Sequence, residues 1–174
     1  RARLKFLIKK LGIEEFIRLV EEERKIIPHD DRWAGYLDGP QNGLSGPIKD
    51  PSTLRAGPYP EGFKEWVAVN VKPQRQEGYA TVTAVCPLGD LSADQMRAIA
   101  DLARIYVGDN IRLTVEQNLV LRWVSENDLP ALFVALREVG LAQPSAGTIV
   151  DVTSCPGTDT CKLGHSSSRG LAAV

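Results

Sequence analysis

The sequence is poor in cysteine, histidine and methionine, and it carries almost no net charge. Its 174 residues include three cysteines, two histidines and one methionine, with 21 basic side chains against 22 acidic ones. Three cysteines are too few for the disulfide scaffold of a small secreted domain. The balanced charge and the lack of a long basic run give no reason to expect a nucleic-acid partner. Neither of these two protein classes is therefore expected.

The sequence also lacks a long apolar run. No stretch approaches the roughly 20 residues that a membrane-spanning helix needs, and no charged, apolar and then small-residue series opens the chain as in a signal peptide. We therefore expect no membrane association, with the cytoplasm as the default location. The chain begins at Arg1, its only methionine is Met96, and it ends thirteen residues after Cys161. This arrangement predicts a fragment of a longer protein.

The first 62 residues divide into a helical part and a loop. Residues 1–27 carry two apolar stripes separated by Gly12, which predict two short amphipathic helices. Residues 28–62 hold six of the eleven prolines and six of the fifteen glycines, which excludes regular structure over most of that stretch. An ordered loop and a disordered linker both remain open. The apolar anchors that an ordered loop would use are Trp33, Tyr36, Leu37, Ile48, Leu54 and Tyr59.

Residues 63–146 alternate strand and helix patterns. Four β-rich runs, paired through short turns, predict strands at 66–72, 79–86, 111–115 and 119–124. Ser92 and Gln95 predict a capping box for a helix that ends at Gly108, and Ser125 is expected to cap a helix that ends at Gly140. This order predicts an α+β fold, a two-layer sandwich with an antiparallel sheet and helices on one face. The side chains expected on the apolar helix faces are Met96, Ile99, Ala100, Leu102, Ala103, Tyr106, Leu129, Leu132, Phe133, Leu136 and Val139.

The predicted strand at 111–115 has one polar side. Alternation places Arg112 and Thr114 away from the helices, and it directs the apolar residues of the strand toward them. Arg112 can fork onto a carboxylate, and short hydrogen-bonding side chains follow at Gln117 and Asn118. Such a set suits a large ligand with several acid groups, although a solvated sheet face that ends in an ordinary turn is the alternative. The apolar residues expected to face the helices are Ile111, Leu113 and Val115.

Two of the three cysteines, Cys155 and Cys161, lie six positions apart in a turn rich in small and polar residues. Cysteine thiolates bind iron–sulfur clusters and zinc, and such a turn can aim both sulfurs at one centre. The alternatives are a local disulfide, two unremarkable thiols, or a zinc site completed by His165. Cys86, at the end of a predicted strand, is expected to be a small buried hydrophobe.

The region from Gly89 to Cys161 resembles the sulfite and nitrite reductase hemoprotein family. The resemblance rests on the joint order of Gly-Asp-Asn-Ile-Arg-Leu-Thr at 108–114, Gln-Asn at 117–118, a helix ending in Gly-Leu at 140–141, and Cys-x5-Cys at 155–161. Residues 3–8, with Gly12 and Phe16, resemble the connector between the two halves of that family. The resemblance implies a helical connector at 1–27, a loop at 28–62, a ferredoxin-like half domain at 63–146 and the start of the catalytic domain at 147–174.

The family implies siroheme and a [4Fe-4S] cluster, and the six-electron reduction of sulfite to sulfide or of nitrite to ammonia. The electron donor would be ferredoxin or a flavoprotein. By the resemblance, Cys155 and Cys161 are two of the four cluster ligands. The siroheme contacts that it implies are Arg112, Thr114, Gln117 and Asn118.

No catalytic residue is assigned. The family's second cysteine pair and its substrate-binding Arg and Lys side chains fall outside these residues, and Val150 and Asp151 stand where its first halves have Arg-Asn. We therefore expect the 174 residues alone to hold neither cofactor nor activity. The alternative function is a non-catalytic α+β binding module that recruits a partner protein through its polar sheet face.

Overall fold

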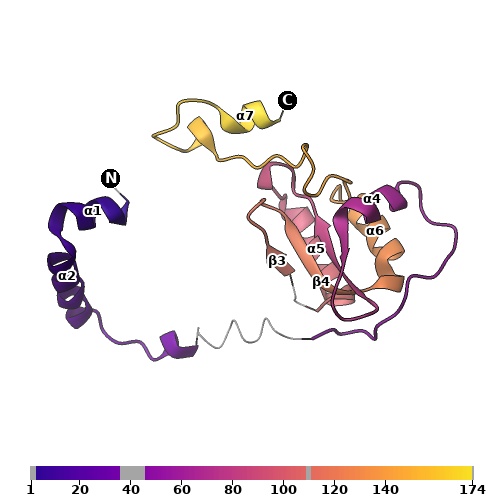
Figure 1. Ribbon diagram of the computed structural model, residues 1–174, viewed down its shortest axis with the longest axis horizontal. Coiled ribbons are helices and arrows are strands. Elements are labelled where there is room, and N and C mark those ends of the chain that lie inside the picture. Colours follow the sequence, from indigo (N-terminus) through magenta and orange to yellow (C-terminus); the bar gives the residue numbers. More distant parts are fainter. Residues whose placement is uncertain (1–2, 36–45, 109–110, 174) are drawn as a thin grey trace. The chain divides into compact units, whose positions relative to one another are not determined.

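The computed structural model describes residues 3–35, 46–108 and 111–173, and it divides into two units, Arg1–Asn42 and Gly43–Val174 (Figure 1). Among the described residues, no helix is both long and apolar enough to cross a membrane. The predicted anchors Tyr36 and Leu37 lie outside the described residues.

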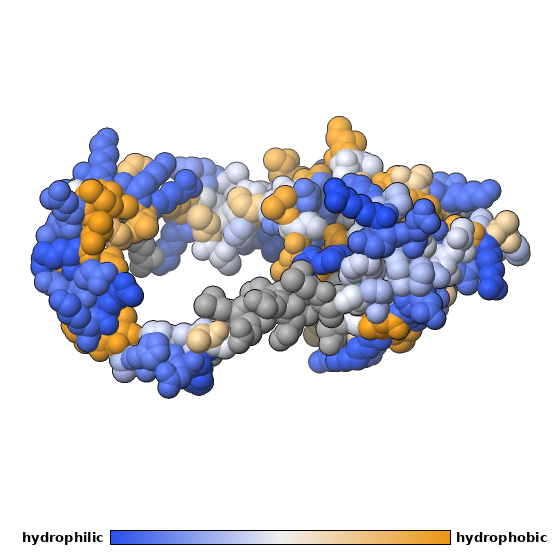
Figure 2. Space-filling model, turned by 60° about the horizontal axis from the view of Figure 1, so that its bottom comes forward, coloured by the Kyte–Doolittle hydropathy of each residue, from blue (hydrophilic) through white to orange (hydrophobic). Residues whose placement is uncertain are grey.

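The first unit contains the two predicted amphipathic helices. Helix α1 spans Leu4–Leu11 and α2 spans Ile13–Ile26, with Gly12 between them at a φ of 84°. No residue of these two helices, both wholly within the described range, is buried. Figure 2 shows their hydrophobic side chains gathered in a stripe along this unit. The helices are therefore confirmed, and they have no core of their own.

The second unit is a two-layer sandwich with one antiparallel sheet. Its strands are β1 (Val71–Pro73), β2 (Tyr79–Ala84), β3 (Ile111–Leu113) and β4 (Leu119–Ser125), in the order β1-β2-β4-β3. Its main helices are α4 (Phe63–Asn70), α5 (Ala93–Tyr106) and α6 (Leu129–Glu138). The core forms between the layers, and its fully buried side chains include Trp66, Val82, Leu121, Leu132 and Leu136. The α+β fold expected from the sequence is confirmed (Figure 1).

The strand predicted at 66–72 is wrong over most of its length. Residues Phe63–Asn70 form helix α4, and only Val71–Pro73 pair with β2. The helix follows Gly62, whose φ of 79° is readily adopted by glycine. Phe63, Trp66 and Asn70 are buried, and this i, i+3, i+7 spacing is that of one helix face. The valines of this stretch favoured a strand. Helical spacing, however, places Phe63 and Trp66 on the same side of the chain, and both side chains are then buried in the core.

Local signals set the ends of α5 correctly. Ser92 and Gln95 form the predicted capping box, with the Gln95 N–H donating to Ser92 Oγ at 3.1 Å. Gly108 follows the helix at a φ of 59°. Met96, however, is 59% exposed and does not join the core. It lies on the first turn of α5. Amphipathic periodicity predicts which side of a helix is apolar, but it does not predict how much of that side the sheet covers.

The helix after β4 begins later than expected. A 3-10 turn, Glu126–Asp128, precedes α6, and the side chain of Ser125 makes no cap hydrogen bond. Its hydroxyl instead donates to the Asp50 carbonyl oxygen at 2.9 Å. Gly140 ends the helix as predicted, at a φ of 74°.

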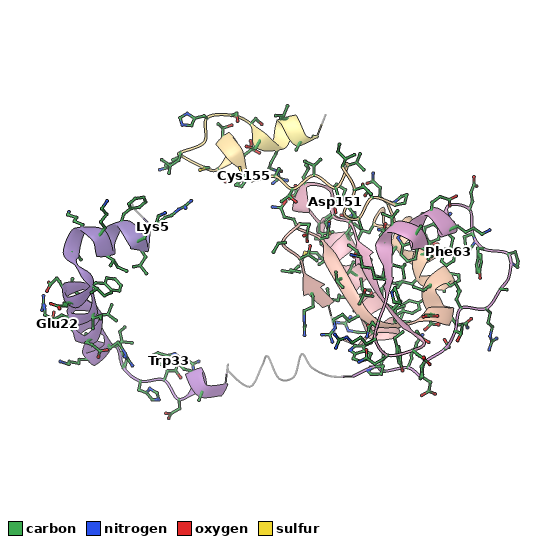
Figure 3. All side chains as sticks on the ribbon, in the orientation of Figure 1. Lys5, Glu22, Trp33, Phe63, Asp151 and Cys155 are labelled. Carbon is green, nitrogen blue, oxygen red and sulfur yellow. The ribbon has the colours of Figure 1, made fainter. Side chains whose placement is uncertain are left out.

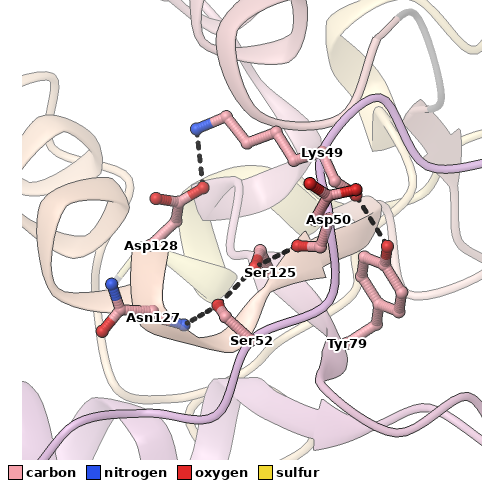
Figure 4. Close-up of polar contacts among 7 residues, drawn as sticks. All are labelled: Lys49, Asp50, Ser52, Tyr79, Ser125, Asn127 and Asp128. Atoms are coloured by element: carbon pink, nitrogen blue, oxygen red, sulfur yellow. Dashed lines mark hydrogen bonds and ion pairs between the residues drawn. The ribbon is translucent and has the colours of Figure 1, made fainter.

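Loop residues 49–52 lie on the half domain through a polar network (Figure 4). Lys49 forms an ion pair with Asp128 at 2.6 Å, and the Tyr79 hydroxyl donates to the Lys49 carbonyl oxygen at 2.6 Å. The hydroxyls of Ser52 and Ser125 lie 2.6 Å apart. These contacts support the ordered alternative for the described part of the loop. Farther along the loop, Leu54 and Tyr59 pack against the core as anchors.

Two other proposed anchors stay exposed. Trp33 is 47% exposed and Ile48 is 51% exposed. Within the second unit, apolar character alone did not separate Ile48 from Leu54 and Tyr59, which pack against the core.

Candidate cofactor site

The sheet face away from the helices is polar, as predicted, and it borders a groove of about 270 Å³. Leu119 and Leu121 of β4 are buried toward the helices, so Val120 faces the other way. The groove lies between this face and residues 146–151. Its polar lining residues are Lys72, Thr81, Thr83, Thr114, Glu116, Asn118 and Asp151.

Arg112 and Thr114 lie where the alternation placed them. Arg112 pairs with Val120 across the β3–β4 ladder and therefore shares its face, and its side chain is exposed. Thr114 lines the groove, and its Oγ1 accepts the Asn118 N–H at 3.2 Å. Its hydroxyl hydrogen remains able to donate to a ligand.

The apolar half of the same prediction is wrong for two residues. Leu113 is 84% exposed and Val115 is 89% exposed, and only Ile111 packs against the core. Strand β3 is a three-residue edge strand that pairs only with β4. The alternation of side chains along a strand determines the direction in which each one points. It does not determine whether a helix covers that side of the strand.

Gln117 and Asn118 lie side by side in the turn, but their side chains contact the segment before Cys155. The Gln117 Nε2 donates to the Ser154 carbonyl oxygen at 2.9 Å, and the Ser154 N–H donates back to Gln117 Oε1 at 3.2 Å. Asn118 is 2% exposed, and its amide donates to the two Asp151 carboxylate oxygens at 3.0 and 2.9 Å. The structure thus brings the turn and the cysteine segment together.

Cys155 and Cys161 are free and exposed, in a segment that runs from Asp151 at the half domain to the short helix α7 (Ser168–Ala172) (Figure 3). The Cys161 N–H donates to the Gly157 carbonyl oxygen at 2.9 Å, which closes the turn between them. The chain packs on itself so tightly here that a Cβ on Gly157 would lie 2.6 Å from the Ser166 carbonyl oxygen. The turn is therefore compact, although both thiols stay open to solvent.

Hydrogen bonding favours the thiolate form of Cys155. The Ser168 hydroxyl, with Oγ 3.4 Å from the sulfur, and the Gly157 backbone N–H lower the pKa of the Cys155 thiol. Burial has the opposite effect on Cys86, whose pKa is raised and whose side chain is 4% exposed. Cys86 is the small buried hydrophobe that the sequence predicted, whereas the thiolate, the ligand form, is favoured at Cys155.

Two of the alternatives for the cysteine turn, the disulfide and the zinc site, are not assembled in the described residues. Cys155 and Cys161 are not joined in a disulfide. Within residues 3–35, 46–108 and 111–173, no three His, Cys, Asp or Glu side chains come together as a metal site, so His165 does not complete a zinc site with them.

Sequence patterns did not predict three contact residues of this region. Asp151 stands out in the sequence only as a departure from a family pattern, and Ser168 has no signal other than its place in a serine run. Lys72 belongs to the strand pair that the sequence predicted, and in the structure it lies opposite Thr81. Long-range contacts like that of Asp151 leave no local pattern in the sequence.

Comparisons with known proteins agree with this picture. Residues 72–139 match the family model described as nitrite/sulfite reductase ferredoxin-like half domain. The chain is 30% identical to sulfite reductase (ferredoxin) 2 of Mycolicibacterium paratuberculosis, over 97% of the chain and 26% of that protein. It is 32% identical to the chloroplastic ferredoxin–nitrite reductase of Zea mays, over 92% of the chain and 25% of that protein.

A solved structure gives the same result. The chain matches the NirA protein of Mycobacterium tuberculosis with a TM-score of 0.53 and 28% identity, over 99% of the chain and 27% of that structure. The chain thus spans about a quarter of the length of the relatives it matches. Together with the polar sheet face and the paired cysteines, these matches show that residues 72–139 form a ferredoxin-like half domain of the nitrite and sulfite reductase family.

Proposed function

We propose that this chain is part of a siroheme- and iron–sulfur-dependent reductase that converts sulfite to sulfide or nitrite to ammonia by six-electron reduction. The observation that carries the proposal is the placement of two free, exposed thiols directly after a segment held by the half domain's turn. The named relatives use ferredoxin, and we propose a ferredoxin-type donor here as well.

The residues present fit these cofactors. A cluster needs thiolate ligands open to its iron, and the Ser168 hydroxyl and Gly157 N–H favour the thiolate of Cys155. A siroheme carries acid groups, and the cationic side chains of the polar face include Arg112 and Lys72. When bound, the two groups supply single-electron transfer to the substrate, which protein side chains alone cannot.

In this proposal, the residues of the chain bind the two cofactors and orient them. Cys155 and Cys161 would each hold iron, while hydrogen bonds to the Cys155 sulfur tune its donor strength. Arg112 and Thr114 would contact siroheme from the polar face. The side chains of Gln117 and Asn118, also predicted as siroheme contacts, are directed to the cysteine segment. No residue of the chain is proposed to donate a proton to substrate.

Replacing Arg112 with alanine in the full-length protein should weaken siroheme binding. One charge-assisted contact contributes about 1.5 to 3 kcal/mol, which corresponds to roughly a tenfold to hundredfold loss of affinity. The fold should survive, because the side chain is exposed. The measurement is siroheme content per protein after dialysis, with Arg97→Ala, an exposed arginine of α5 paired with Asp94, as the control. Equal siroheme content in the Arg112→Ala and wild-type proteins would reject the contact.

The function itself is tested on the full-length protein by iron analysis, visible absorption and assays with both anions. We expect bound iron, the absorption of siroheme, and donor-dependent loss of sulfite or nitrite. A protein without iron or chromophore that still binds a partner through the polar sheet face would instead support the non-catalytic binding module.

A further inference from the structure

The segment that leads into Cys155 is held by side chains rather than by a strand ladder. Gln117 bonds both the N–H and the carbonyl oxygen of Ser154, at 3.2 and 2.9 Å. A carboxamide that pairs with both polar groups of one residue fixes its position and its direction, much as a neighbouring strand would. Ser154 is the residue directly before the proposed cluster ligand Cys155.

A second contact holds the same segment three residues earlier. Asn118 is buried, and its amide donates to both oxygens of Asp151. Its Oδ1 accepts the Cys86 N–H at 2.9 Å, which anchors Asn118 to the backbone just after β2. The Asp151 carboxylate also accepts the Gly147 N–H at 2.8 Å. The buried end of the sheet is therefore connected to the cysteine segment through hydrogen bonds made by one side chain.

The backbone at Gln117 indicates that its side chain has a specific role. Its φ is 65°, in the left-handed region that glycine and asparagine adopt more readily than glutamine. Such strain persists only where the surroundings impose it. Gly89 packs directly against this side chain, because a Cβ added there would lie 2.9 Å from the Gln117 Cβ. Gln117 thus has a strained backbone, and the position beside it has room only for a glycine. This arrangement places the Gln117 carboxamide against Ser154.

We propose that Gln117 and Asn118 form a clamp that positions Cys155 for cluster ligation, and that this positioning, rather than siroheme contact, is the role of their side chains. The inference rests on the cluster role proposed above for Cys155. The Cys155 sulfur contacts the Ser168 hydroxyl and the Gly157 N–H, both of which belong to the segment after it. Gln117 holds the backbone directly before Cys155, and thereby connects the thiol to the half domain.

The variant Gln117→Asn shortens the side chain without adding backbone strain, so it tests the side-chain hydrogen bonds alone. Asparagine keeps the amide and suits a positive φ, but it is one methylene too short to bond Ser154 from the same backbone. In the 174-residue chain we expect an unchanged circular dichroism spectrum, and exchange of the Ser154 amide hydrogen about tenfold faster, measured by mass spectrometry. Gln76→Asn, at an exposed glutamine whose side chain contacts only Gln74 among the described contacts, is the matched control. Unchanged Ser154 exchange in Gln117→Asn would overturn the clamp.

The second arm tests the role of the clamp in the full-length protein. We expect iron loss to a chelator to be about tenfold faster in Gln117→Asn than in wild type, as for other groups that orient metal ligands, while siroheme content stays at the wild-type level. Gln117→Glu, which keeps one acceptor but sets an oxygen against the Ser154 carbonyl, should behave similarly. Wild-type rates of iron loss in both variants would overturn the positioning role. Loss of siroheme with retained cluster would overturn it in favour of direct siroheme contact. A wild-type protein without iron would instead reject the proposed function, and with it this role.

Discussion

Replacing Cys155 or Cys161 with serine in the full-length protein is expected to abolish the iron–sulfur cluster and the reductase activity. A serine hydroxyl has a far higher pKa than a thiol and is a poor iron ligand at neutral pH. Both cysteines are free and exposed, so neither substitution removes a core contact. The measurements are iron and acid-labile sulfide per protein, together with steady-state reduction of sulfite and nitrite.

Cys86→Ser is the matched control for the two cysteine substitutions. Cys86 is buried, and its sulfur lies 3.7 Å from the Ala84 carbonyl oxygen, to which a serine hydroxyl can also donate. We expect the Cys86→Ser protein to keep its iron and to lose at most a little stability. Retained iron in Cys161→Ser, or lost iron in Cys86→Ser, would show that the ligands are assigned incorrectly.

Replacing Trp66 with alanine is expected to destabilise the half domain far more than the cysteine or glutamine substitutions do. Trp66 is fully buried, and its ring packs against Phe133 at a centroid distance of 5.1 Å and against Phe63 at 6.0 Å. Removing a buried aromatic ring leaves a cavity and costs about 3–5 kcal/mol, a large share of the roughly 5–15 kcal/mol that stabilises a typical domain. Urea unfolding of the 174-residue chain, followed by far-ultraviolet circular dichroism, measures the loss.

Trp33→Ala controls for the loss of a tryptophan as such. Trp33 is 47% exposed and lies in the first unit, so its removal should change the urea midpoint of the second unit little. Trp66→Phe should retain most of the stability, because a smaller ring still fills part of the space. Equal urea midpoints for Trp66→Ala and Trp33→Ala would contradict the packing of α4 against α6.

Residue patterns close together in the chain were sufficient where local chemistry decides the structure. The capping box of Ser92 and Gln95, and the positive φ at Gly12 and Gly140, are consequences of backbone groups within a few residues. The spacing of Cys155 and Cys161 likewise pointed to the turn that carries them. For these features, sequence analysis and structure agree because no distant residue is needed.

Long-range packing decided the rest. Helix α4 forms where a strand was predicted, because the helical spacing lets Trp66 pack against Phe133 of α6, which lies far along the chain. The sequence placed Gln117 on a polar turn, but only the folded chain brings it to Ser154, 37 residues away. Local sequence patterns indicate which side chains can be buried and which can donate a hydrogen bond. The partner depends on how distant segments of the folded chain meet, and here the Gln117 side chain, predicted to contact siroheme, donates a hydrogen bond to Ser154.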